Sequence, residues 1–248
     1  MLDVRERFES RLGEVEDYLE LLSRLDDEAR RTPKLPSIGG VTLTRTQQGI
    51  LYSVVYLQLY NLMEATVTWC LEAVSQAAAE GGRWRPSDLC EGLRREWIRQ
   101  TARTHTELIP EHRLAWATAM CDHLIQSLPV RRLEIECGSG NWDEDQVRAA
   151  TQRIGLELRL SKEVFSLIKQ PVRDEKGPLV LVKDYRNRLA HGSISFAECG
   201  EGVSTEDLTR VKDRTAGYLR EVVRAFELYI ADHRYLSPDA RPQPPEAA

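Results

Sequence analysis

Hydrophobic residues recur at steps of three and four along most of the chain, which is the period of an amphipathic α-helix. The first such run covers residues 2–30, and prolines at positions 33 and 36 stop it. Its apolar stripe consists of Phe8, Leu12, Val15, Leu19, Leu22 and Leu25. The pattern therefore predicts a long helix at the N-terminus.

The same period predicts two further long helices. One covers residues 44–80 and ends at Gly81-Gly82. The other is opened by Ser204 and continues almost to Tyr235. The apolar stripe of this last helix is formed by Leu208, Val211, Thr215, Leu219, Val222, Phe226 and either Tyr229 or Ile230. Three helices of this length are enough to form the centre of a bundle.

Shorter elements are predicted between the second long helix and the last one. Helices are expected over residues 87–101 and 111–128, and another from about residue 179 to Gly192, which suits the left-handed position after a helix end. Alternating apolar residues at positions 133, 135 and 137 predict a short strand. Asn141 followed by Glu144 resembles a capping box at the start of a short helix.

Together these patterns predict an all-α protein, a helical bundle with long antiparallel helices. No internal repeat, heptad array or obvious linker divides the chain. We expect a single helical domain over residues 1–235, with an inserted, mostly helical lobe at about residues 86–177. Residues 236–248 are rich in proline and lack a packing pattern, so a flexible tail is expected there.

The composition is that of an ordinary folded domain, with 42% hydrophobic and 29% charged residues among 248. The first residues, MLDVRERFES, carry both charge signs and no apolar h-region, so we expect no secretory signal and a cytoplasmic location. The longest uncharged run, residues 46–63, is interrupted by glutamines and an asparagine and ends at Glu64. We interpret this run as a buried helix; a membrane span is the remote alternative.

Metal, cofactor and disulfide chemistry are not indicated. The five cysteines are odd in number, widely spaced and without a C-x-x-C pair, which favours reduced core thiols. His105, His112 and His123 do not form H-E-x-x-H, so we expect no metal and no cofactor. Gly138-Ser139-Gly140 lacks the residues that complete a phosphate-binding loop, and a turn is predicted there instead.

Positive charge is concentrated in one part of an acidic chain. The formal net charge is −5, which argues against a protein covered with basic surface for duplex DNA. Residues 159–188 nevertheless hold eight basic and four acidic side chains, a balance of +4. This cluster would suit an anionic substrate such as a phosphodiester, and it would equally suit a solvated helix face.

The basic segment ends in the sequence DYRNRLAHG, residues 184–192. On a helix, residues four apart lie nearly above one another, so Asn187 and His191 share a face. Arg186 is offset from both, but its long side chain can bring the guanidinium toward the imidazole. The stretch therefore places an arginine, a neutral amide and a histidine around one small volume.

This stretch resembles the signature of HEPN domains, in which an arginine followed by a polar residue precedes a histidine by a few positions. RNRLAHGSISF before a long amphipathic helix, LYNLMEA in an earlier long helix and GNWDEDQVRAATQRIGL between them resemble the MAE-type, restriction-toxin-like branch of this superfamily. The resemblance covers residues from about 46 to 231 and is strongest from 183 to 196. It implies a HEPN-like helical bundle.

The resemblance further implies a metal-independent endoribonuclease of the toxin–antitoxin or antiphage-defence type. Such a protein cleaves RNA through the 2'-hydroxyl and leaves 2',3'-cyclic phosphate and 5'-hydroxyl ends. It is usually a homodimer with the active site at the two-fold interface, and an antitoxin or defence-system protein is a possible partner. No membrane association is expected. The alternative from another functional class is a non-catalytic HEPN-like module that binds nucleotide or protein. A third interpretation is a purely structural role for the motif.

The resemblance assigns catalysis to three residues whose chemistry suits it. His191 can transfer a proton near neutral pH, Arg186 can hold the phosphate through its planar fork, and Asn187 can orient the phosphate or His191. Five further residues are candidates for support or phosphate binding: Arg188, Lys183, Tyr185, Glu64 and Asn61.

Alternatives stay open for several of the supporting residues. Arg188 could contact the phosphate in place of Arg186. Tyr185 could stack a base, but its apolar spacing is more typical of a core tyrosine. Glu64 lies among apolar neighbours and requires a partner, so we expect it to pair with Arg186 or Arg188; the alternative is that it points to solvent or to a cap.

Overall fold

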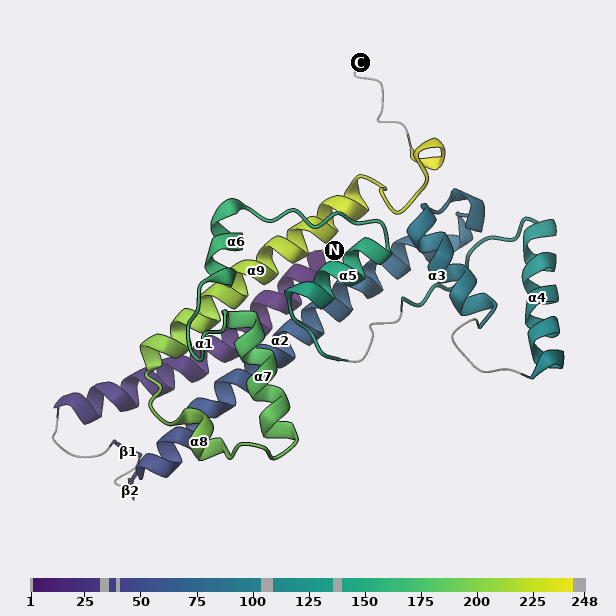
Figure 1. Ribbon diagram of the computed structural model, residues 1–248. Coiled ribbons are helices and arrows are strands. Elements are labelled where there is room, and N and C mark those ends of the chain that lie inside the picture. The colour runs from purple at the N-terminus through teal and green to yellow at the C-terminus, as the bar shows by residue number, and fades with distance from the viewer. Residues whose placement is uncertain (1, 32–35, 39–40, 104–108, 136–139, 243–248) are drawn as a thin grey trace, which may run out of the picture.

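The computed structural model describes residues 2–31, 36–38, 41–103, 109–135 and 140–242. Three long helices lie side by side and form its axis: α1 (Leu2–Arg31), α2 (Arg45–Ala79) and α9 (Thr205–Ala231). Helix α1 runs opposite to α2 and α9, which run in the same direction (Figure 1). The predicted all-α fold class and the three predicted long helices are confirmed.

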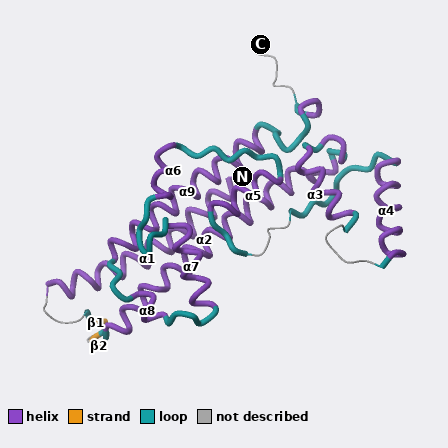
Figure 2. Tube along the Cα trace, viewed as in Figure 1, coloured by secondary structure: helices purple, strands orange, loops and turns teal. Residues whose placement is uncertain are grey.

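Shorter elements cover the sides and ends of this axis. They are α3 (Glu91–Thr101), α4 (Pro110–Ile125), α5 (Glu144–Arg153), α6 (Lys162–Lys169), α7 (Pro178–Ala190) and α8 (Phe196–Gly200), with 3-10 turns at Glu80–Gly82, Pro86–Asp88 and Pro238–Ala240. Strands β1 (Ser37–Ile38) and β2 (Val41–Thr42) pair antiparallel as a small hairpin between α1 and α2 (Figure 2). Helices α6 and α8 were not predicted from the sequence.

Two local predictions are wrong. Leu133 and Ile135 are buried but lie in irregular backbone, because no strand pairs with them in the described part of the chain; residue 137 lies outside it. Asn141 does not cap α5. Instead, the Asp143 carboxylate accepts a hydrogen bond from the Gln146 backbone N–H at 3.0 Å, which leaves Asn141 available for another contact.

The predicted flexible tail is also wrong at its beginning. Leu236 is fully buried and forms an antiparallel bridge with Leu89. The backbone N–H of Ser237 donates to the Asp88 carbonyl at 2.8 Å, and that of Cys90 donates to the Tyr235 carbonyl at 2.9 Å. The chain end is therefore fixed to the segment just before α3. Residues 243–248 lie outside the described part of the chain.

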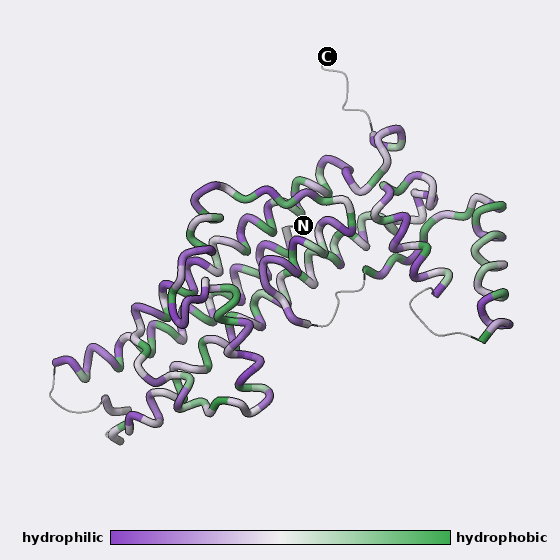
Figure 3. The backbone as a smooth tube through the Cα atoms, viewed as in Figure 1, coloured by the Kyte–Doolittle hydropathy of each residue, from purple (hydrophilic) through white to green (hydrophobic). Residues whose placement is uncertain are grey.

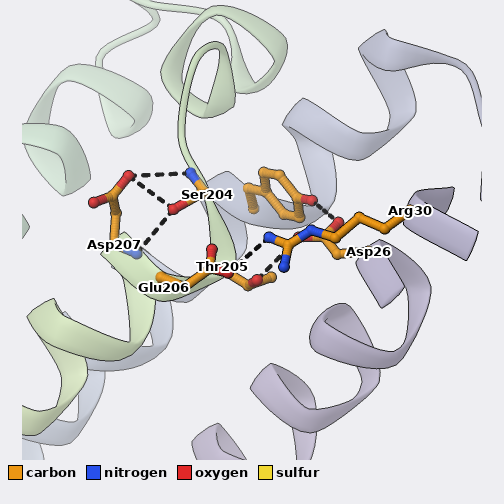
Figure 4. A network of polar contacts seen from close by, with 7 residues as sticks. Asp26, Arg30, Ser204, Thr205, Glu206 and Asp207 are labelled. Carbon is orange, nitrogen blue, oxygen red and sulfur yellow. Dashed lines mark hydrogen bonds and ion pairs between the residues drawn. The ribbon is translucent and has the colours of Figure 1, made fainter. Parts of the chain in front are cut away.

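A polar network joins the end of α1 to the start of α9 (Figure 4). The Thr205 hydroxyl donates to the Asp26 carboxylate at 2.9 Å, and the Tyr52 hydroxyl of α2 donates to the same carboxylate. Arg30 pairs with Glu206 at 2.6 Å and lowers the pKa of Glu206 to about 2. All three long helices are thus connected at one end of the bundle.

Helix α8 lies close against the beginning of α2 because glycines stand at the contact. A Cβ atom on Gly200 would be 2.0 Å from the Gly49 carbonyl oxygen, and one on Gly49 would be 2.7 Å from the Ala197 carbonyl oxygen. No side chain fits between these backbones. This approach fixes α8, and with it the loop that follows α7.

The amino-acid pattern of α4 sets this helix apart. It stands away from the three-helix axis although much of it is hydrophobic (Figure 3). None of its residues is buried. Leu114 and Ile125 are its most exposed large apolar side chains.

Among the described residues, no helix is both long and apolar enough to cross a membrane.

Alkaline pH is expected to unfold the protein cooperatively, because its largest fully buried side chains include several tyrosines. Burial raises the pKa of Tyr56 to about 12, and burial also raises the pKa of Tyr218 and Tyr229. Unfolded tyrosines ionise near pH 10, so this stability is complete below pH 10 and is lost as pH rises toward 12. Circular dichroism and tyrosinate absorbance should change together; tyrosinate formation near pH 10 with intact helices would contradict this.

Candidate functional site

Helix α7 carries the candidate motif, and its ends are set by local sequence. Pro178 occupies the first turn, where its missing N–H costs no hydrogen bond. One face packs into the core through Leu179, Leu181, Val182, Tyr185 and Leu189. The helix closes at His191, whose backbone N–H donates to the Asn187 carbonyl, and Gly192 follows with φ of 68°. The predicted role of Gly192 as the stop residue is confirmed.

Arg186 leaves this helix toward α2. Its guanidinium carbon lies 4.5 Å from the ring centroid of Tyr60, which is cation–π distance. Its Nη1 donates a hydrogen bond to the Oδ1 atom of Asn187 at 3.0 Å. Among the described residues, no carboxylate lies within ion-pair distance of Arg186. Within the described residues, the charge of this guanidinium is therefore not offset by an adjacent carboxylate.

The other cations of α7 are already paired. Lys183 forms an ion pair with Asp143, the residue that caps α5. Arg188 lies 3.7 Å from the Asp184 carboxylate, which also accepts a bond from Lys176 at 2.8 Å. Of the three cations of α7, Arg186 is therefore the one without a carboxylate partner among the described residues.

The segment Gly140–Asp143 is attached by hydrogen bonds both to Tyr60 of α2 and to Asn187 of the motif. The Tyr60 hydroxyl donates to the Gly140 carbonyl and accepts from the Trp142 backbone N–H at 3.2 Å. The Nδ2 atom of Asn187 donates to the Oδ1 atom of Asn141 at 2.8 Å. Gly140 has φ of 68°, and a Cβ on it would meet the Glu64 carboxylate at 3.0 Å. Tyr60 is fully buried, which raises the pKa of its hydroxyl.

His191 lies at the open end of this arrangement. Its side chain is exposed, and in the described part of the chain no hydrogen bond or ion pair holds the imidazole. The site thus combines a guanidinium without a carboxylate partner among the described residues, an oriented amide, and an accessible imidazole at the C-terminal end of α7. Within the described residues, no group of three or more His, Cys, Asp or Glu side chains is placed to hold a metal ion.

Comparison with protein families identifies the family of the chain. The family described as HEPN_MAE_28990-like HEPN matches residues 3–235. This chain belongs to that HEPN family. No curated protein and no solved structure matches it. The resemblance seen in the motif is therefore confirmed, and it extends over nearly the whole chain and includes α1.

The structure brings the three expected catalytic residues of this HEPN protein into one short segment. Arg186 contacts Asn187 directly, and His191 follows one helical turn after Asn187. Lys183 lies on the same helix, but its ammonium is held by Asp143. Lys183, one of the expected supporting residues, therefore lies beside the site and forms a structural ion pair with Asp143.

Tyr185 and Arg188 belong to the other side of α7. Tyr185 is 2% exposed, its ring meets Tyr56 edge to face at 4.8 Å, and its hydroxyl donates to Asp174 at 2.7 Å. Tyr185 is therefore a core tyrosine, as its apolar spacing favoured, and the alternative of base stacking is excluded because the ring is buried. The Arg188 guanidinium lies 5.5 Å from the same ring and close to Asp184.

The expected pairing of Glu64 is also wrong. Neither Arg186 nor Arg188 forms an ion pair with it; the Glu64 carboxylate lies beside Gly140 instead. Asn61 is exposed on α2 and lines a cavity with Arg11 and Glu14 of α1. The helical spacing of α2 was correct, but spacing alone does not show which neighbour each face meets.

Sequence reasoning missed the residues that actually contact Arg186 and Asn187. Tyr60 stands inside an apolar stretch that reads as core, and Asn141 stands where a helix cap was expected. Both lie in segments quoted for the family resemblance, LYNLMEA and GNWDEDQ. Their presence in these two segments was the one signal in the sequence, and it did not indicate which residues they would contact.

Proposed function

We propose that this HEPN protein is a metal-independent endoribonuclease of the toxin or antiphage-defence type. The observation that supports this most is the Arg186 guanidinium, which has no carboxylate partner among the described residues and is followed five positions later by an exposed histidine. A structural arginine in a helical bundle is normally paired, as Arg188 is here. An unpaired, oriented guanidinium suits an anionic substrate.

The reaction would be an internal transfer of the phosphodiester. The ribose 2'-oxygen attacks phosphorus, the bond from phosphorus to the 5'-oxygen breaks, and the products carry a 2',3'-cyclic phosphate and a 5'-hydroxyl. Arg186 would stabilise the charge that develops on the non-bridging oxygens. His191, in its neutral form, would take the proton of the 2'-hydroxyl. DNA lacks that hydroxyl and would not be cleaved.

The departing 5'-oxygen needs a proton, and each chain offers one histidine in the motif. We therefore propose a homodimer in which the partner's His191 is the acid while this chain's His191 is the base. Val180 on α7 and Phe196 at the start of α8 are exposed apolar side chains close to the motif in sequence, and they support an interface there. Control in the cell would require an antitoxin or a defence-system partner.

The proposal is tested by incubating a structured RNA with wild type and with His191→Ala in excess EDTA, followed by analysis of fragment ends. Wild type should give cyclic phosphate and 5'-hydroxyl ends, and His191→Ala should cleave at least about 10²-fold more slowly. His112→Ala is the matched control, because His112 is exposed on α4, a helix that carries no motif residue.

Two results would count against the proposal. If both proteins remain folded dimers and leave every RNA and cellular extract fraction uncut, the non-catalytic binding module becomes the better reading. If His191→Ala cleaves as fast as wild type and His112→Ala, the activity comes from another site or from a contaminant.

A further inference from the structure

We propose that Tyr60 and Asn141 are positioning residues that hold Asn187 and Arg186 in the geometry needed for cleavage. This inference rests on the proposed nuclease function. It also gives Asn187 a role toward Arg186, because the oxygen of its amide accepts from Arg186 while the nitrogen donates to Asn141.

The direction of each hydrogen bond follows from the donor chemistry. Arginine has donors only, so Arg186 must meet the Oδ1 atom of Asn187. The Nδ2 atom of Asn187 then points the other way and requires an acceptor, which is the Oδ1 atom of Asn141. An alanine at position 141 would free the Asn187 amide to rotate. Arg186 would then lose its fixed hydrogen-bond partner, although neither Arg186 nor Asn187 had been changed.

Tyr60 contacts this arrangement twice, through its ring and through its hydroxyl. Its ring supports the guanidinium at 4.5 Å, which leaves the planar fork fewer orientations. Its hydroxyl bridges the Gly140 carbonyl and the Trp142 backbone N–H, the residues on either side of Asn141. One buried side chain therefore sets both the position of Arg186 and the position of the acceptor for Asn187.

We call the contacts of Tyr60 and Asn141 with Arg186 and Asn187 the clamp. At Asn141, the effect of the clamp on catalysis can be measured apart from any effect on fold stability. Asn141 is exposed, and its bond to Asn187 lies at the surface. Removal of such a group changes stability little, so Asn141→Ala should melt within about 2 °C of wild type. A displaced guanidinium should nevertheless lower kcat by roughly 10- to 100-fold, with KM changed less than about threefold, because orientation matters most in the transition state.

A double-mutant cycle distinguishes positioning from a general effect on the loop. Cleavage is measured for wild type, Asn141→Ala, Asn187→Ala and the double variant. If Asn141 acts through Asn187, its loss should have no further effect in the Asn187→Ala background. An equal loss in both backgrounds, or no loss in either, would overturn the inference. Gln146→Ala, at an exposed neutral position on α5, serves as the control.

A second readout is independent of activity. In protein labelled at arginine, the ring of Tyr60 should shift the δ-proton signal of Arg186 upfield, with assignment through Arg186→Lys. Tyr60→Phe keeps the ring and should keep the shift, whereas Tyr60→Leu should remove it. The signal of Arg220, which lies 5.9 Å from the ring of Phe8, should be unchanged in both variants.

The two readouts separate the two proposals. If wild type cuts no RNA but the Arg186 shift is present and disappears in Tyr60→Leu, the clamp stands and the nuclease function is wrong. If wild type cuts RNA but Arg186 shows no upfield shift, or keeps it in Tyr60→Leu, the clamp is wrong and the nuclease function stands.

Discussion

Arg186→Lys is expected to slow RNA cleavage by about 10²-fold, although the positive charge is kept. Lysine offers a point charge on a flexible stem, and it cannot at once donate to Asn187, lie flat on Tyr60 and present further donors to a phosphate. Single-turnover cleavage of one RNA substrate measures the effect. The rate constant should fall far more than the affinity for uncleavable RNA.

Arg188→Lys is the matched control, because Arg188 lies two residues away on the same helix and is paired with Asp184. It should change the cleavage rate by less than about tenfold. Sequence alone left open which of the two arginines contacts the phosphate. A larger loss in Arg188→Lys than in Arg186→Lys would assign that role to Arg188.

Gly200→Ala is expected to lower the free energy of unfolding by about 3 kcal/mol, because the added methyl group would meet backbone and not a movable side chain. Its Cβ would be 2.0 Å from the Gly49 carbonyl oxygen, so α8 must move away from α2. For a domain of this size the melting temperature should fall by about 6–12 °C. Thermal unfolding followed by circular dichroism measures the change.

Gly217→Ala provides the comparison. Gly217 lies inside α9, and a Cβ there would have no atom within 4 Å. Alanine at this position should leave stability unchanged or raise it by up to about 1 kcal/mol, because it favours the helix more than glycine does. Equal melting temperatures for Gly200→Ala and wild type would show that the α2–α8 contact is looser than the backbone distances indicate.

The sequence predicted the elements whose signals are local. Helical periodicity identified all three long helices, and Ser204 was correctly placed as the cap of α9, where its hydroxyl accepts from the Asp207 backbone N–H at 3.1 Å. Arg186, Asn187 and His191 lie within six consecutive positions, so one helix and its C-cap suffice to bring them together. These features depend on neighbours within about one turn.

What the sequence did not predict depends on contacts between distant segments. Asn141 and Asn187 are 46 positions apart, and Tyr60 and Trp142 are 82 apart. Periodicity placed Glu64 on the correct helix, and a turn was predicted at residues 138–140, of which only Gly140 is described, with φ of 68°. No local pattern indicated that this glycine would be the neighbour of the Glu64 carboxylate. Tyr185 shows the same limit: an apolar stripe identifies burial but not the partners within the core.

The attachment of Leu236 to Leu89 determines how far the chain can be shortened. A form that ends with the last long helix, at Ala231, would contain every residue of the motif and every long helix. It would still leave Leu89, which is fully buried, without its cover, and would expose an apolar surface next to α3. Affinity tags and fusions should therefore follow Arg241, and deletions should stop before they reach it.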